Sequence, residues 1–153
     1  MIADWYFDFV SPYAYLQSEQ LSALGPRVSV RYRPVLFAGL LGANGQKGPA
    51  EIPAQRIFTY RYCIWRAKEL GIGLRFPPEH PFNPLPLLRL AIACDSTSAV
   101  VHRIFRFVWH DGRLPDLPIE SLDLEIVVEE IVPNFTRFLQ EGRNLQTVVT
   151  KTA

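Results

Sequence analysis

The hydrophobic pattern of the chain begins with a nearly continuous apolar run close to its start. Aromatic and β-branched residues fill almost all of positions 5–10. A short run of this composition is typical of a strand whose two faces are both covered. The sequence therefore predicts a buried strand over residues 2–10.

The apolar run ends at Ser11 and Pro12, which mark the start of a helix. Proline suits the first helical position because its φ is already helical and its missing N–H would have no partner there. The serine before it is then the N-cap, whose oxygen accepts a hydrogen bond from a first-turn amide. Free amides and the positive end of a helix dipole can hold an anion or a thiolate. Ser11 is therefore either a helix cap alone or a cap that also contacts a ligand.

The pattern continues with a helix and a second strand. Apolar residues on one arc predict a helix over residues 13–24, which Gly25 and Pro26 end. Residues 28–33 alternate between apolar and polar side chains, as in a half-buried strand. Such a βαβ unit is right-handed and its strands are parallel. Active sites collect at the carboxyl ends of these strands, which is where Ser11 lies.

Two loops rich in glycine and proline alternate with three further predicted helices. Residues 36–54 form the first loop, predicted without secondary structure, and a connection this long is either functional or a mobile linker. A helix is predicted over residues 55–70, and a proline-dense loop follows at 75–84. Amphipathic spacing predicts the last two helices at 85–96 and 98–109.

Length and charge narrow the class of protein. A chain of 153 residues is one domain's worth, and 48% hydrophobic with 20% charged residues is ordinary for a globular protein. The net charge of +1 gives no field that favours nucleic acid or a membrane surface. The start of the chain lacks the features of a secretory signal, and no apolar run reaches membrane-spanning length. We therefore expect a cytoplasmic protein with neither a nucleic-acid nor a membrane partner.

Four segments of the chain resemble a known family. The run Phe7-Asp8-Phe9-Val10-Ser11-Pro12-Tyr13-Ala14-Tyr15 resembles the opening of the 2-hydroxychromene-2-carboxylate isomerases, and residues 47–54, 80–84 and 105–113 match further on. These isomerases are relatives of the kappa-class glutathione transferases within the DsbA-like thioredoxin group. The resemblance covers about residues 2–113. It implies an α/β fold with a thioredoxin-like βαβ half at 1–36, followed by an active-site loop and a helical insertion at 37–113.

The cysteines do not fit thiol–disulfide chemistry. A redox protein of the thioredoxin type needs a nucleophilic cysteine at the strand–helix joint, usually with a second one three positions on. Those positions hold Ser11 and Ala14, which excludes dithiol exchange. Cys63 and Cys94 lie within helical patterns, so we expect buried free thiols. His80 has no cysteine or histidine at metal-ligand spacing, so we expect no metal site.

The resemblance implies a glutathione-dependent cis–trans isomerase that acts on 2-hydroxychromene-2-carboxylate-like aromatic acids. Ser11 would be the catalytic residue, donating a hydrogen bond to the glutathione thiolate. A charge-assisted bond contributes about 1.5–3 kcal/mol, which is about one to two units of thiol pKa. The thiolate would add reversibly to the ring-opened substrate, permit bond rotation and leave.

The matched segments imply the remaining site residues. Those for glutathione, the expected cofactor, are Ser11, Pro12, Gln46, Lys47 and Arg56. Those for the substrate are Tyr13, His80, Phe82 and Asn83. The family commonly has a lysine just after the first loop, where this chain has Gln55 and Arg56, so an anion contact would pass to Arg56. Asn83 also suits the N-cap of the next helix, which is its structural alternative.

The resemblance ends after Arg113, and residues 114–153 form a divergent tail without a Gly-Val-Pro-Thr-like segment. The second thioredoxin half of the family is therefore not recognisable, and we expect an incomplete fold at the C-terminal end. The strand at 2–10 would then expose an apolar edge. Three explanations are open. The tail replaces the missing strands, a second copy of the chain covers the exposed edge in a homodimer, or the chain is a truncated or frame-shifted version.

Two other functions compete with the isomerase. One is a kappa-like glutathione transferase that conjugates electrophiles, and the other is a non-catalytic truncated relative in which Ser11 is only a cap. Consumption of glutathione separates transferase from isomerase. The small-molecule partner is accordingly an aromatic acid or an electrophile.

Overall fold

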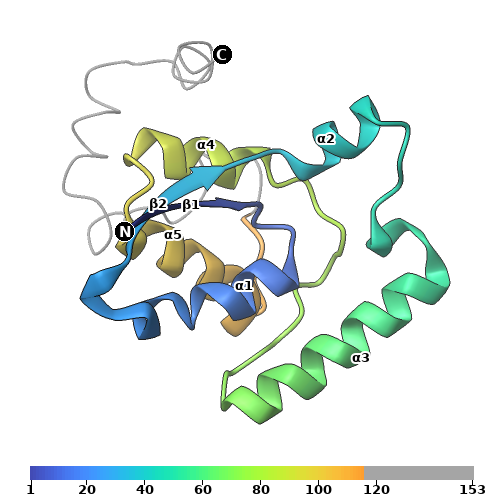
Figure 1. Cartoon of the computed structure of the whole chain (residues 1–153). Coiled ribbons are helices and arrows are strands. Elements are labelled where there is room, and N and C mark those ends of the chain that lie inside the picture. Colours follow the sequence, from blue (N-terminus) through green and yellow to red (C-terminus); the bar gives the residue numbers. More distant parts are fainter. Residues whose placement is uncertain (116–153) are drawn as a thin grey trace.

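The computed structural model describes residues 1–115. Its strands are β1 (Ile2–Phe7) and β2 (Ser29–Pro34), and its α-helices are α1 (Pro12–Ser18), α2 (Phe37–Ala43), α3 (Pro53–Leu70), α4 (Leu85–Ala93) and α5 (Ser98–Phe105). Two 3₁₀ segments, η1 (Leu21–Arg27) and η2 (Pro49–Glu51), and a π-helical turn, η3 (Arg106–His110), complete the set (Figure 1). The predicted divergent tail lies, from residue 116 onward, outside the described residues, and the domain limits at 36 and 113 stay predictions.

The two strands pair in parallel, from Ile2 opposite Ser29 to Phe7 opposite Pro34, which confirms the predicted parallel pairing of the βαβ unit. Strand β1 is shorter than predicted because the chain turns at Asp8, whose carboxylate accepts a hydrogen bond from the amide of Val10 at 3.1 Å. The prediction that both faces of this strand are covered was wrong for the described residues. Phe7 is buried but its neighbour Tyr6 is 66% exposed.

The segments after each strand also differ from the predictions. Helix α1 begins at Pro12 as predicted but ends at Ser18, where the Ser18 hydroxyl donates to the Tyr15 carbonyl at 2.7 Å. Such side-chain bonds compete with the helical ladder, and the chain continues in 3₁₀ form through η1. The prediction of an unstructured loop at 36–54 was wrong, because this stretch contains α2 and η2.

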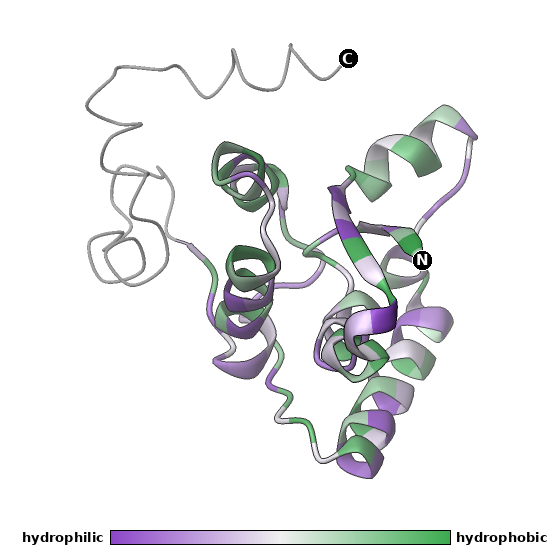
Figure 2. Ribbon diagram, turned by 60° about the vertical axis from the view of Figure 1, so that its left-hand side comes forward, coloured by the Kyte–Doolittle hydropathy of each residue, from purple (hydrophilic) through white to green (hydrophobic). Residues whose placement is uncertain are grey.

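The core lies between β1 and helices α4 and α5. Its centre is a cluster of rings in which Phe9 and Phe105 have centroids 4.7 Å apart and Trp5 and Phe7 have centroids 4.9 Å apart. Helix α4 is hydrophobic over most of its length, whereas α3 mixes hydrophobic and hydrophilic positions (Figure 2). Trp109 of η3 is fully buried in the same cluster.

Cys63 and Cys94 are buried free thiols, as predicted, and burial raises the pKa of each to about 11. No helix within residues 1–115 combines the length and apolar character needed to cross a bilayer. The same residues contain no group of three histidine, cysteine, aspartate or glutamate side chains placed to share a metal ion.

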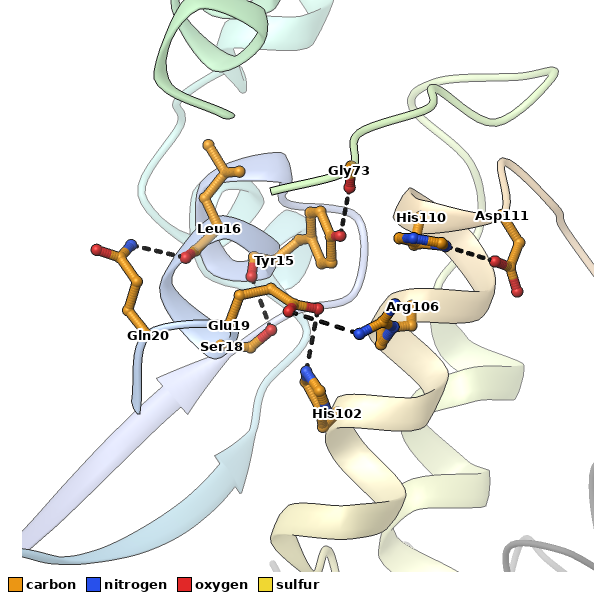
Figure 3. A network of polar contacts seen from close by, with 10 residues as sticks. All are labelled: Tyr15, Leu16, Ser18, Glu19, Gln20, Gly73, His102, Arg106, His110 and Asp111. Carbon is orange, nitrogen blue, oxygen red and sulfur yellow. Dashed lines mark hydrogen bonds and ion pairs between the residues drawn. The ribbon is translucent and has the colours of Figure 1, made fainter. Parts of the chain in front are cut away.

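A network of polar side chains fixes α1 against its neighbours (Figure 3). Glu19, just after α1, contacts His102 Nε2 at 3.0 Å and Arg106 Nη1 at 3.8 Å. The Tyr15 hydroxyl donates to the carbonyl of Gly73 at 2.5 Å. The helix that starts beside Ser11 is therefore attached both to α5 with η3 and to the segment that follows α3.

Candidate functional site

The turn between β1 and α1 is organised around the buried carboxylate of Asp8. One carboxylate oxygen accepts from the Val10 amide at 3.1 Å and the other from the Phe37 amide at 2.8 Å. The Ser11 amide donates to the Asp8 carbonyl at 3.1 Å. Burial raises the pKa of Asp8, although these amides oppose that shift. Asp8 thus joins the turn before Ser11 to the start of α2.

The carbonyl groups of Phe9 and Val10 are held by two side chains that come from much later in the chain. Trp109 Nε1 donates to the Phe9 carbonyl at 2.8 Å. His80 Nε2 lies 2.8 Å from the Val10 carbonyl oxygen. Since backbone polar groups inside a protein need partners, these contacts satisfy the turn while fixing the direction in which it leaves the strand.

Ser11 is the N-cap of α1, as predicted. Its backbone is extended, with φ −93° and ψ 114°, and its Oγ accepts from the Ala14 amide at 3.2 Å. An oxygen that accepts this bond still has its hydroxyl hydrogen to donate. Within residues 1–115 that hydrogen has no protein acceptor, and the side chain is half-buried at the wall of a cavity.

The cavity has a volume of about 530 Å³ and is walled by the Ser11 turn, the stretch from α2 to η2, residues 80–84 and one residue of α3. Six of the predicted site residues line it: Ser11, Pro12, Tyr13, Gln46, His80 and Phe82. The fold therefore brings together segments that are up to 70 positions apart in sequence, as the contact of His80 with Val10 shows.

The other three predicted site residues, Lys47, Arg56 and Asn83, are exposed and lie outside the described lining. The side-chain oxygen of Asn83 accepts from the Leu85 amide at 3.1 Å, which is close to its structural alternative at the start of α4. The sequence also missed Thr59, a buried polar residue of α3 in the cavity wall.

The described lining offers hydrogen-bonding groups to a ligand but no positive charge for a carboxylate. Ser11 offers a hydroxyl donor and Gln46 an amide, whereas the lining within residues 1–115 includes no lysine or arginine. The positive charge of Arg56 adds to burial in lowering the pKa of His80, which is one of the lining residues.

Stability is expected to fall as the pH drops below about 6.5, the ordinary pKa of histidine, because burial lowers the pKa of His80 in the folded chain. The Val10 carbonyl opposes this shift and the Arg56 charge adds to it. The unfolded chain then takes up a proton first, so this contribution is complete above pH 6.5 and is lost between the two pKa values.

Urea unfolding of the wild type and of His80→Gln at a pH above and a pH below 6.5 measures the effect. The difference in unfolding free energy between the two proteins is compared at the two pH values, because the other titrating groups contribute equally to both proteins. A difference that stays constant with pH would contradict a neutral, buried His80.

Comparisons with known proteins identify relatives of this chain. Residues 2–148 match the family model of the DSBA-like thioredoxin domain. The 2-hydroxychromene-2-carboxylate isomerase of Pseudomonas putida is 33% identical over 127 residues, which cover 80% of this chain and 62% of the relative. The enzyme of the same name from Pseudomonas sp. (strain C18) is 35% identical over 127 residues, covering 80% and 59%. Glutathione S-transferase kappa 1 of Caenorhabditis elegans is 33% identical over 78 residues, covering 49% and 34%.

A solved structure, that of SeMet 2-hydroxychromene-2-carboxylate isomerase (HCCA isomerase), matches with a TM-score of 0.68 at 26% identity, covering 98% of this chain and 70% of that one. The chain spans 59–62% of the length of the first two of these relatives. The family match continues past Arg113, where the resemblance read from the sequence ends.

Proposed function

The chain belongs to the DsbA-like thioredoxin family, as predicted, and from that premise we propose that it binds glutathione in the cavity beside Ser11 as a glutathione-dependent cis–trans isomerase. Its substrates would be aromatic acids like 2-hydroxychromene-2-carboxylate, the compound in the names of its relatives. The predicted α/β fold with a thioredoxin-like part is confirmed.

The observation that carries the proposal is the placement of Ser11. Its hydroxyl adjoins a cavity at the carboxyl end of β1, where its oxygen accepts from the Ala14 amide and its hydrogen meets no protein acceptor within residues 1–115. Bound glutathione would supply a thiol. A hydroxyl donor favours the thiolate form of that thiol over its neutral form and so lowers its pKa.

The other residues would bind and orient. Pro12 and Gln46 line the cavity and would contact the tripeptide, while the exposed side chains of Lys47 and Arg56 would meet its carboxylates at the rim. On the substrate side we propose Tyr13, His80, Phe82 and Asn83. Tyr13 and Phe82 offer ring surface in the lining, which suits an aromatic acid.

A kappa-like glutathione transferase is the second candidate, favoured by the similarity to a kappa glutathione S-transferase. The same thiolate site would serve both reactions. Titration of free thiol during turnover separates them, because isomerisation leaves glutathione unchanged and conjugation to an electrophile consumes it.

Glutathione binding measured by calorimetry is expected to be about ten- to a hundredfold weaker in Ser11→Ala than in the wild type, since a bond to a charged group contributes about 1.5–3 kcal/mol. Ser29→Ala is the matched control, because Ser29 is exposed on β2 and outside the cavity lining. Loss of the cap would also cost about 1 kcal/mol of stability. Equal affinities for Ser11→Ala and the wild type would reduce Ser11 to a helix cap, as in the non-catalytic alternative.

A further inference from the structure

His80 is held between two protein partners, although its ring lies in the cavity wall. Its Nε2 is 2.8 Å from the Val10 carbonyl oxygen, and its Nδ1 is 2.7 Å from the Tyr60 hydroxyl. The ring also packs edge-on against Trp109, with centroids 5.3 Å apart. Both nitrogens are thus engaged with the protein itself.

These contacts define the tautomer of the imidazole. A carbonyl oxygen can only accept, so the hydrogen of His80 lies on Nε2 and is donated to Val10. In a neutral ring the other nitrogen is then an acceptor, and the Tyr60 hydroxyl donates to it. Burial lowers the pKa of the ring and so favours its neutral form. The result is a directed chain of hydrogen bonds from Tyr60 on α3, through His80, to the residue before Ser11.

We propose that His80 is a positioning residue, whose Nε2–H fixes the Val10 carbonyl and thereby the turn that presents Ser11 to the cavity. This role is additional to the substrate contact proposed for His80, because both ring nitrogens are taken by the protein and only the ring face is left for a ligand. Trp109 secures the preceding carbonyl in the same way, so the two side chains together hold consecutive peptide groups. The positioning of the turn does not depend on any ligand, whereas its effect on the pKa of a bound thiol rests on the function proposed above.

Hydrogen exchange without any ligand tests the positioning role directly. In His80→Leu, which keeps an apolar side chain but no donor, the amides of Val10 and Ser11 are expected to exchange about five- to tenfold faster, the worth of one net hydrogen bond. Leu90→Ala is the control, because Leu90 is buried on α4 and a cavity there lowers global stability without touching this turn. Denaturant is adjusted so that both variants have the same global stability.

His80→Gln and Tyr60→Phe separate the hydrogen bond from general packing. Glutamine restores an N–H donor near the place of Nε2, so exchange in His80→Gln is expected to return towards the wild-type rate. Tyr60→Phe removes the donor to Nδ1 and is expected to weaken the Nε2–H preference, read from the ¹⁵N shifts of the ring. A wild-type ring with its hydrogen on Nδ1, or unchanged exchange at Val10 and Ser11 in His80→Leu, would overturn the inference.

A second measurement links the turn to the thiol site. The pKa of bound glutathione, followed by thiolate absorbance during a pH titration, is expected to rise in His80→Leu, as in Ser11→Ala, and to stay unchanged in Leu90→Ala. If the wild type binds glutathione and His80→Leu leaves the thiol pKa unaltered, the inference fails while the proposed function stands. If the wild type binds no glutathione but exchange accelerates in His80→Leu, the proposed function fails and the positioning role stands.

Discussion

Replacement of Trp109 by alanine is expected to lower the free energy of unfolding by about 3–5 kcal/mol, the usual cost of removing a buried aromatic side chain. Trp109 is fully buried, and its ring contacts those of Phe76, His80 and Phe82. Its Nε1–H also holds the Phe9 carbonyl, which would lose its partner. A loss of this size is a large fraction of the 5–15 kcal/mol typical of a domain.

Trp65→Ala is the matched control for this prediction. Trp65 is 51% exposed on α3, so the same substitution should change stability far less. Denaturant unfolding, followed by circular dichroism, measures both variants without depending on tryptophan fluorescence. A greater loss in Trp65→Ala than in Trp109→Ala would mean that the core is centred on α3 instead of η3.

Replacement of Asp8 by alanine is expected to cost about 2–5 kcal/mol and to weaken glutathione binding. The substitution leaves the part-buried amides of Val10 and Phe37 without their acceptor, and a group left unpaired inside a protein costs about 1–3 kcal/mol, less where water reaches it. Both the Ser11 turn and the start of α2 lose their common anchor. Stability from urea unfolding and affinity from calorimetry should therefore fall together.

Asp4→Ala provides the comparison on the same strand. Asp4 pairs with Arg31 and Arg33 on the exposed face, where solvent screens the charges, so its loss should be much smaller and should spare glutathione binding. Asp8→Asn keeps one acceptor and should fall between alanine and the wild type. Equal losses in Asp4→Ala and Asp8→Ala would argue against an organising role of Asp8.

Features with a local cause could be read from the sequence. Serine followed by proline predicts an N-cap and a first helical residue from backbone geometry alone, and the structure has both at Ser11 and Pro12. Alternation over residues 28–33 predicts a half-buried strand, observed as β2. The site position also follows, since the chain leaves a parallel strand there.

Features that depend on distant contacts could not be read in this way. The organising role of Asp8 could not be predicted, because it depends on the contact with Phe37, 29 residues later in the chain. The only local signal was a single acidic residue between two aromatic ones, which indicates a carboxylate with buried partners. The exposed position of Lys47 depends on how the chain folds between α2 and η2, in a stretch that glycine and proline made appear irregular, and that of Arg56 depends on which face of α3 packs inward. The homodimer stays a prediction, as do the roles of the individual site residues.

The turn before Ser11 has a further consequence for the order of events during synthesis. Its three side-chain partnerships close sequence separations of 29, 70 and 100 residues, to Phe37, His80 and Trp109 in turn. Contacts of such high order are entropically late, and a nascent chain emerges from its N-terminal end. Ser11 leaves the ribosome well before Trp109, so these three contacts can all be present only after Trp109 has followed. Ligand affinity of ribosome-bound chains of increasing length is therefore expected to stay low until Trp109 has emerged, so that affinity reports how far the fold around Ser11 has formed.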